Sequence, residues 1–165
     1  MHSLLTLGKQ LFSVLFVLAN LFATAAFAAG DVVLTLENTS EGVVVELTED
    51  DLMALPQAVV LTENEFVDGL AEFSGPLARD VIALLNDPDM DMLTLTAIND
   101  YSVEVPVVDF ADYDVIFALF QNGNRFSPRD KGPVWVIYPM TDHEELQDRV
   151  YNDRLIWQLV RVSAL

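Results

Sequence analysis

The sequence predicts an α+β domain with a mixed or antiparallel β-sheet and few, short helices. Two observations lead to this fold class. Stretches with the alternating or continuous apolar residues of β-strands outnumber helical patterns along the chain. The helical patterns also do not alternate regularly with the strands, as they would in a βαβ fold, so a parallel sheet covered by crossover helices is not expected.

The first 28 residues have the parts of a secretory signal peptide. A weakly basic start that includes Lys9 precedes an apolar stretch from Leu11 to Ala25, and Ala26-Phe27-Ala28 has the small residues that signal peptidase recognises. An uncleaved anchor is the alternative, but the stretch is short for a span of about 20 residues. We expect cleavage after Ala28, a periplasmic location, no membrane insertion after cleavage, and one domain over residues 29–165.

The first half of this domain combines strand patterns with two helical ones. Strands are expected over residues 32–37, 43–47, 59–62 and 70–73. A short helix is expected over residues 48–55, because Thr48 can cap its free amide groups and acidic residues follow at the positive end of the helix dipole. Pro76 suits the first turn of a helix, so a second helix is expected over residues 75–85.

The second half is expected to consist mainly of strands. Strands are predicted over residues 93–97, 103–107, 115–120, 134–138 and 155–162, the first two forming a hairpin around residues 98–101. Thr141 and Glu144 have the spacing of a capping box, which predicts a helix from there to about Tyr151.

Composition argues against several classes of partner and chemistry. Seven of the eight basic residues follow the predicted signal peptide, against 26 acidic ones, which gives a net charge near −19. Such a surface repels nucleic acid and anionic membranes. The chain has no cysteine, and its one histidine after residue 28, His143, lies among acidic residues, so no nucleophile can be paired with a base. We predict no catalytic residue, and solvated turns rather than metal sites at residues 87–91 and 142–145.

Two loops carry the side chains of a candidate ligand site. The first has an amide, an acid and a phenol at a hairpin turn, and the second has two cations and an indole ahead of a buried strand. The candidate residues are Asn99, Asp100, Tyr101, Arg129, Lys131 and Trp135. An indole or phenol can stack on a flat heteroaromatic ring, and cations can bind its carbonyl oxygens. The alternative is that Trp135 belongs to the core and that Arg129 pairs with Asp130 or Asp112.

The sequence from Asp114 to Pro139 resembles the sulfite-oxidase-type molybdopterin-binding domain. It contains a strand, an Asn-Gly turn, a Pro-Arg-Asp stretch that ends at a glycine, and a Pro-Val-x-Val strand. Residues 75–82 resemble a helix opening of that family, and residues 99–106 resemble its following hairpin. The resemblance covers residues 45–163 and is specific over residues 95–139.

This resemblance has three departures. The oxidases bind molybdenum through a cysteine, and this chain has none. Lys131 stands where the family has histidine, and Trp135 stands where it has arginine. The resemblance therefore implies a pterin-shaped pocket without molybdenum.

The chain resembles still more closely a short, secreted, cysteine-free branch of this fold. The shared marks include Asn-Asp-Tyr, Arg-Asp-Lys-Gly-Pro-x-Trp and the segment from Tyr151 to Leu159. That similarity implies a regulator that binds a metal-free pterin and signals to the periplasmic domain of a membrane-bound cyclic-di-GMP enzyme or sensor kinase. A degenerate molybdopterin-dependent oxidoreductase subunit is the alternative, and an interaction domain without a ligand is a third hypothesis.

Overall fold

A five-stranded mixed sheet forms one side of the molecule in the computed structural model, which describes residues 30–164. Its strands follow the order β2-β1-β11-β5-β6. They are β1 (Val32–Asn38), β2 (Val43–Thr48), β5 (Met92–Ala97), β6 (Ser102–Pro106) and β11 (Leu159–Ala164). β1 and β11 run parallel, and the other neighbours are antiparallel. The predicted signal peptide lies outside the described residues.

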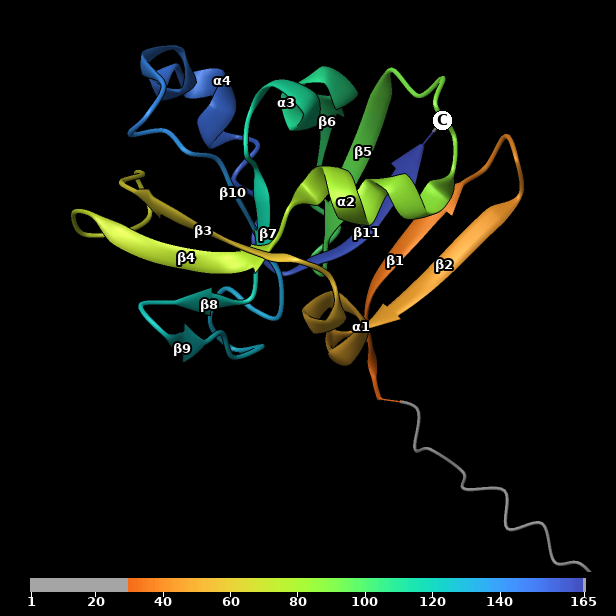
Figure 1. The fold of residues 1–165 in the computed structure, drawn as a ribbon, viewed down its shortest axis with the longest axis horizontal. Coiled ribbons are helices and arrows are strands. Elements are labelled where there is room, and N and C mark those ends of the chain that lie inside the picture. The colour runs from red at the N-terminus through yellow and green to blue at the C-terminus, as the bar shows by residue number, and fades with distance from the viewer. Residues whose placement is uncertain (1–29, 165) are drawn as a thin grey trace, which may run out of the picture.

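Six further strands form a four-stranded sheet and a two-stranded one. The four-stranded sheet has the order β3-β4-β8-β9, and β10 pairs with β7. These strands are β3 (Gln57–Thr62), β4 (Ala71–Pro76), β7 (Ile116–Ala118), β8 (Phe120–Gln121), β9 (Asn124–Arg125) and β10 (Trp135–Ile137). Figure 1 shows the two larger sheets on opposite sides of the molecule, with β7 between them.

The helices are short and connect the strands. They are α1 (Glu49–Ala54), α2 (Ala78–Ile82), η1 (Ala83–Leu85), α3 (Val107–Asp112), η2 (Glu144–Gln147) and α4 (Arg149–Asn152). Thr48 caps α1 as predicted: its hydroxyl accepts from the Asp51 amide, and the Asp51 carboxylate accepts from the Thr48 amide at 2.8 Å. Among residues 30–164, no helix has both the length and the apolar character needed to cross a membrane.

The predicted helix start at Gly75, with Pro76 in the first turn, is wrong. Pro76 is the last residue of β4 and pairs with Gln57, and the helix begins two residues later at Ala78. The reason is the close approach of β4 to β7. A Cβ on Gly75 would lie 2.1 Å from the carbonyl oxygen of Phe117, so only glycine allows this contact.

The predicted capping box at Thr141 is also wrong. The Thr141 hydroxyl accepts from the Glu63 amide at 2.9 Å, and the Thr141 amide donates to the Thr62 hydroxyl at 3.1 Å. A tertiary contact at the end of β3 therefore uses the side chain that was expected to cap a helix. The helical residues that follow are split into η2 and α4, and Asp148 caps α4 by accepting from the Val150 amide.

The last predicted strand begins later than expected. Residues 155–158 form no continuous strand, although Trp157 makes an isolated bridge to Trp135 and the Ile156 carbonyl accepts from the Val136 amide at 2.9 Å. β11 starts at Leu159. These contacts hold residues 155–158 against β10. The side chain of Trp157 is the exposed one in this segment.

The core has two parts, one on each side of β7 and β10. The larger part packs beneath the five-stranded sheet, and the smaller part lies between β3, β4, β7 and β10. Trp135 is fully buried in the smaller part, with ring centroids 5.4 Å from Phe73 and 5.7 Å from Phe126. Its indole N–H donates to the Leu155 carbonyl at 3.0 Å, which satisfies its polar atom.

Candidate functional site

A pocket of about 230 Å³ opens where three segments meet. The segments are the β3–β4 loop, the turn between β5 and β6, and the connection from α4 to β11. The aromatic and polar side chains that line the pocket are Phe66, Asn99, Tyr101, Asn152, Asp153 and Trp157. The pocket therefore combines aromatic rings with amides and one acidic residue, and none of its lining residues within the described part of the chain is cationic.

Aromatic side chains form one part of the pocket wall. The rings of Phe66 and Trp157 meet edge to face with centroids 4.8 Å apart, and Trp157 remains 37% exposed. Tyr101 is also exposed on the rim. A flat heteroaromatic ligand gains from stacking on such faces, because aromatic contacts add to the free energy of apolar burial.

The polar groups of the pocket are fixed by the hairpin turn. The Tyr101 hydroxyl donates to the Asp153 backbone carbonyl at 3.2 Å, and the Asn99 side-chain oxygen accepts from the Tyr101 amide at 3.2 Å. Burial, and then the nearby Asp153 charge, raise the pKa of the Tyr101 phenol. Tyr101 is therefore a neutral hydrogen-bond donor at neutral pH.

The Asp153 carboxylate is available to a ligand. Within the part of the chain that the structure describes, it makes no ion pair and no side-chain hydrogen bond. A carboxylate accepts through two oxygens, which suits a ligand that presents two adjacent N–H donors.

Gln158 brings the two predicted loops to the same side of the molecule. Its backbone carbonyl accepts from the Ile98 amide at 3.0 Å, beside the hairpin turn. Its side-chain amide donates to the Pro128 carbonyl at 2.8 Å, and its backbone amide donates to the Lys131 carbonyl at 3.1 Å. Gln158 thus connects the β5–β6 turn with the loop before β10, although these two loops are about thirty positions apart in the sequence.

The first loop supplies two of its three predicted residues to the pocket. Asn99 and Tyr101 line it. Asp100 does not, because it occupies the tip of the turn, exposed and with a positive φ of 65°. The acidic residue that lines the pocket is Asp153.

The second loop supplies no lining residue. Lys131 donates to the Phe66 carbonyl at 2.9 Å, and its ammonium lies 4.5 Å from the centre of the Trp135 ring. It therefore anchors the β3–β4 loop. Arg129 is exposed and, among residues 30–164, forms neither of the ion pairs considered for it, with Asp130 or with Asp112.

The expectation that Trp135 stacks on a ligand is wrong for this structure. Its ring has no exposed surface, and Phe73, Phe126 and Lys131 surround it. The exposed indole at the pocket is Trp157, which lies 6.4 Å from Trp135. The alternative that placed Trp135 in the core is confirmed.

Sequence reasoning missed four of the six aromatic and polar residues that line the pocket, and part of the signal was present. Asn152, Asp153 and Trp157 belong to the segment from Tyr151 to Leu159, whose residues carry part of the family resemblance. Phe66 carried a weaker signal, as a lone aromatic residue in an acidic loop. Such a residue has no local core to join, so its ring must pack on another segment.

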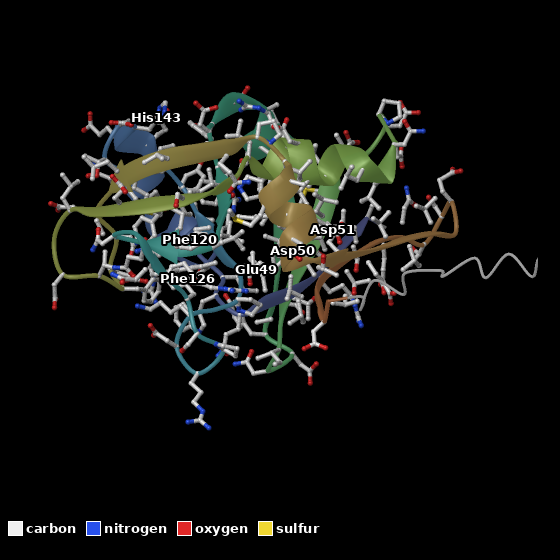
Figure 2. The ribbon with its side chains drawn as sticks, turned by 60° about the horizontal axis from the view of Figure 1, so that its bottom comes forward. Glu49, Asp50, Asp51, Phe120, Phe126 and His143 are labelled. Atoms are coloured by element: carbon white, nitrogen blue, oxygen red, sulfur yellow. The ribbon has the colours of Figure 1, made fainter. Side chains whose placement is uncertain are left out.

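A second hollow, of about 650 Å³, lies near the start of α1. Figure 2 shows Glu49, Asp50 and Asp51 there, with Phe126 nearby and His143 in a different part of the molecule. Arg125 pairs with Glu49, so the one cation in its lining already has a partner. Among the described residues, no group of three His, Cys, Asp or Glu side chains is arranged to hold a metal ion.

No family model matches the chain, and no curated protein matches it. Among solved structures, the sulfane dehydrogenase SoxCD from Paracoccus pantotrophus is similar, with a TM-score of 0.60 and 16% sequence identity. The similarity covers 79% of this chain and 37% of that one, so the chain spans little more than a third of its neighbour's length. The predicted α+β fold of the sulfite-oxidase type is confirmed, and the likeness concerns the fold alone.

Proposed function

We propose that this protein is a non-catalytic, periplasmic pterin-binding regulator. It binds a metal-free pterin and presents the bound state to the periplasmic domain of a membrane-bound cyclic-di-GMP enzyme or sensor kinase. The observation that carries the proposal is the aromatic pocket at the β5–β6 turn, with the unpaired Asp153 carboxylate in its lining.

The chemistry of a pterin matches this lining. A pterin is a flat bicyclic ring with an amino group and ring nitrogens on one edge and a carbonyl oxygen beside them. Trp157 and Tyr101 supply aromatic faces on which the ring can stack. The Asp153 carboxylate can accept hydrogen bonds from the N–H groups of the pterin, and the Asn99 side-chain amide can donate one to its carbonyl oxygen. Pockets for drug-sized ligands measure about 300–1,000 Å³, so a pocket of about 230 Å³ suits a ligand of few rings.

The Asp153→Asn variant tests the binding site. The substitution keeps the size of the side chain but removes its charge and replaces one acceptor with a donor. Losing a charged hydrogen bond costs about 1.5–3 kcal/mol, so we expect pterin affinity to fall about 10- to 150-fold. Quenching of pterin fluorescence on titration with protein measures the affinity.

Asp100→Asn is the matched control. Asp100 lies beside the pocket without lining it, and asparagine tolerates its positive φ. We expect Asp100→Asn to bind pterin as the wild type does. Equal affinity of Asp153→Asn and wild type would place the site elsewhere, and a wild type that binds no pterin at tens of micromolar would refute the function.

A degenerate molybdopterin-dependent oxidoreductase subunit is the second candidate, because the fold is shared with a sulfane dehydrogenase. Molybdenum prefers a soft thiolate anchor, and the sequence contains no cysteine to provide one. We expect elemental analysis of the natively purified protein to find no stoichiometric molybdenum. A value near one molybdenum per chain would favour the oxidoreductase over the regulator.

A further inference from the structure

β3 ends the four-stranded sheet, and its outer edge is unpaired. Among residues 30–164, its backbone pairs with β4 alone, in an uninterrupted register from Gln57–Pro76 to Thr62–Ala71. The Thr141 contact covers only the Thr62 end. Figure 1 shows β3 and β4 extending away from the five-stranded sheet.

The other outer strands of the two larger sheets carry features that discourage pairing. β2 contains Glu46, and its ladder with β1 is irregular between Val32 and Leu34. β6 contains Glu104 and ends at Pro106. β9 is two residues long. Charges, prolines, irregularities and short length are the usual protections of an exposed edge.

β3 has none of these protections. Its sequence is Gln-Ala-Val-Val-Leu-Thr, without charge or proline, and its pairing with β4 has no bulge. Val59 and Leu61 point away from the core and are 64% and 52% exposed, and Leu70, just before β4, is also exposed. An uncharged, regular edge with apolar side chains on its open face is suited to receive another strand.

The charge around β3 indicates what kind of strand this edge receives. Residues 31–78 contain many acidic side chains and no lysine, arginine or histidine. Glu63, Glu65 and Asp68 are exposed just beyond the end of β3, and Glu72 lies opposite Leu61. A second copy of this chain would bring the same negative charges together, whereas a strand flanked by basic residues would be attracted.

We propose that β3 accepts an extended segment of a partner protein as an added β-strand, with alternating apolar residues and lysine or arginine at its ends. The role of this edge in signalling rests on the proposed function, but the pairing of a strand with β3 does not depend on a bound pterin. The β3–β4 loop connects this edge to the pocket, because Phe66 in that loop lines the pocket and is held by Lys131.

A model peptide tests the edge on the ligand-free protein. The probe is a labelled peptide of six alternating valine and threonine residues with two lysines at each end, and its counterpart has glutamates in place of the lysines. We expect the lysine peptide to bind in fluorescence anisotropy, more weakly as salt rises, and to slow amide hydrogen exchange at residues 57–61. The glutamate peptide should bind at least about tenfold more weakly.

Charged variants locate the binding. Val59→Lys and Leu61→Lys place a charge on the open face of β3 without reaching the core, and each should weaken binding of the lysine peptide about tenfold or more. Val44→Lys is the control, because Val44 is 62% exposed on the outer strand β2. It should bind the peptide as the wild type does. Circular dichroism checks that each variant is folded.

Three results would overturn the proposal: no change in exchange at residues 57–61, equal binding by Val59→Lys and wild type, or dimerisation of the protein through β3 in sedimentation. None of these results bears on the pterin titration, which concerns the pocket. Conversely, a failure of pterin binding leaves the peptide result intact, so the two proposals are tested separately.

Discussion

Trp135 and Trp157 differ in burial although their rings lie 6.4 Å apart. Trp135 stands on β10, whose residues are all buried, and its N–H is satisfied by the Leu155 carbonyl. Trp157 lies in the irregular segment between α4 and β11, packs against Phe66 and keeps 37% of its surface exposed. One tryptophan therefore stabilises the fold, and the other is available to a ligand.

Alanine variants of the two tryptophans separate these roles. Trp135→Ala leaves a cavity in the smaller core and should lower the free energy of unfolding by about 3–5 kcal/mol. Trp157→Ala removes a partly exposed ring and should lower it by much less, while it weakens pterin binding. Urea unfolding measures the first quantity and pterin titration the second. Equal destabilisation by both changes would contradict the assignment.

At the scale of elements, the contact between β4 and β7 sets where the strands of the smaller core lie. Gly75 allows the two backbones to approach so closely that a Cβ would meet the Phe117 carbonyl oxygen and carbon and the Ala118 Cα, all within 3.0 Å. These are backbone atoms, which cannot move aside without shifting β7. The same glycine was expected to open a helix, so its role depends on a strand about forty residues away.

Gly75→Ala should therefore be strongly destabilising, although alanine is usually a mild replacement for glycine. We expect the thermal midpoint to fall by several degrees or the variant to be recovered unfolded, because strand separation loses packing throughout the smaller core. Gly30→Ala is the matched control, since its Cβ would lie 3.5 Å from Thr48 in ordinary contact. Similar midpoints for Gly75→Ala and wild type would show that β7 can shift.

Across the protein, repulsion between negatively charged side chains is the dominant long-range interaction. The chain carries a formal net charge of −18. The few exposed ion pairs, such as Arg79–Asp114 and Arg161–Glu37, are each worth little. The buried Arg154–Asp109 pair, to which the Tyr138 hydroxyl also donates at 2.9 Å, joins three segments inside the domain and is shielded from salt. Mutual repulsion at the surface should therefore govern how stability depends on salt.

Raising NaCl from about 10 mM to about 150 mM shortens the screening length from about 30 Å to about 8 Å and should raise the thermal midpoint. Glu65→Gln removes one exposed negative charge in an acidic loop, so it should stabilise the protein at low salt. That gain should shrink at the higher salt concentration. A midpoint that falls with salt would mean that attractive surface pairs outweigh the repulsion.

Local patterns were sufficient to predict most strands and two of the six aromatic and polar residues that line the pocket. The β1–β2 and β5–β6 hairpins and the capped helix α1 were predicted because alternation and capping depend on neighbouring residues. Asn99 and Tyr101 were found because a hairpin turn necessarily presents its polar residues together. Asp153 and Trp157 were not found, because their places in the pocket depend on how the chain packs after α4.

Residue types and short-range order are sufficient to predict most elements, the α+β class, the lack of thiolate chemistry and the strongly acidic surface. Packing between distant segments settles which strands are neighbours, that Thr141 binds the end of β3 instead of capping a helix, and that Trp135 is buried while Trp157 is exposed. The parallel pairing of β1 with β11 joins opposite ends of the domain. The physical reason is that these outcomes depend on packing between segments far apart in the chain, where burial and backbone hydrogen bonds of the whole domain outweigh any local preference.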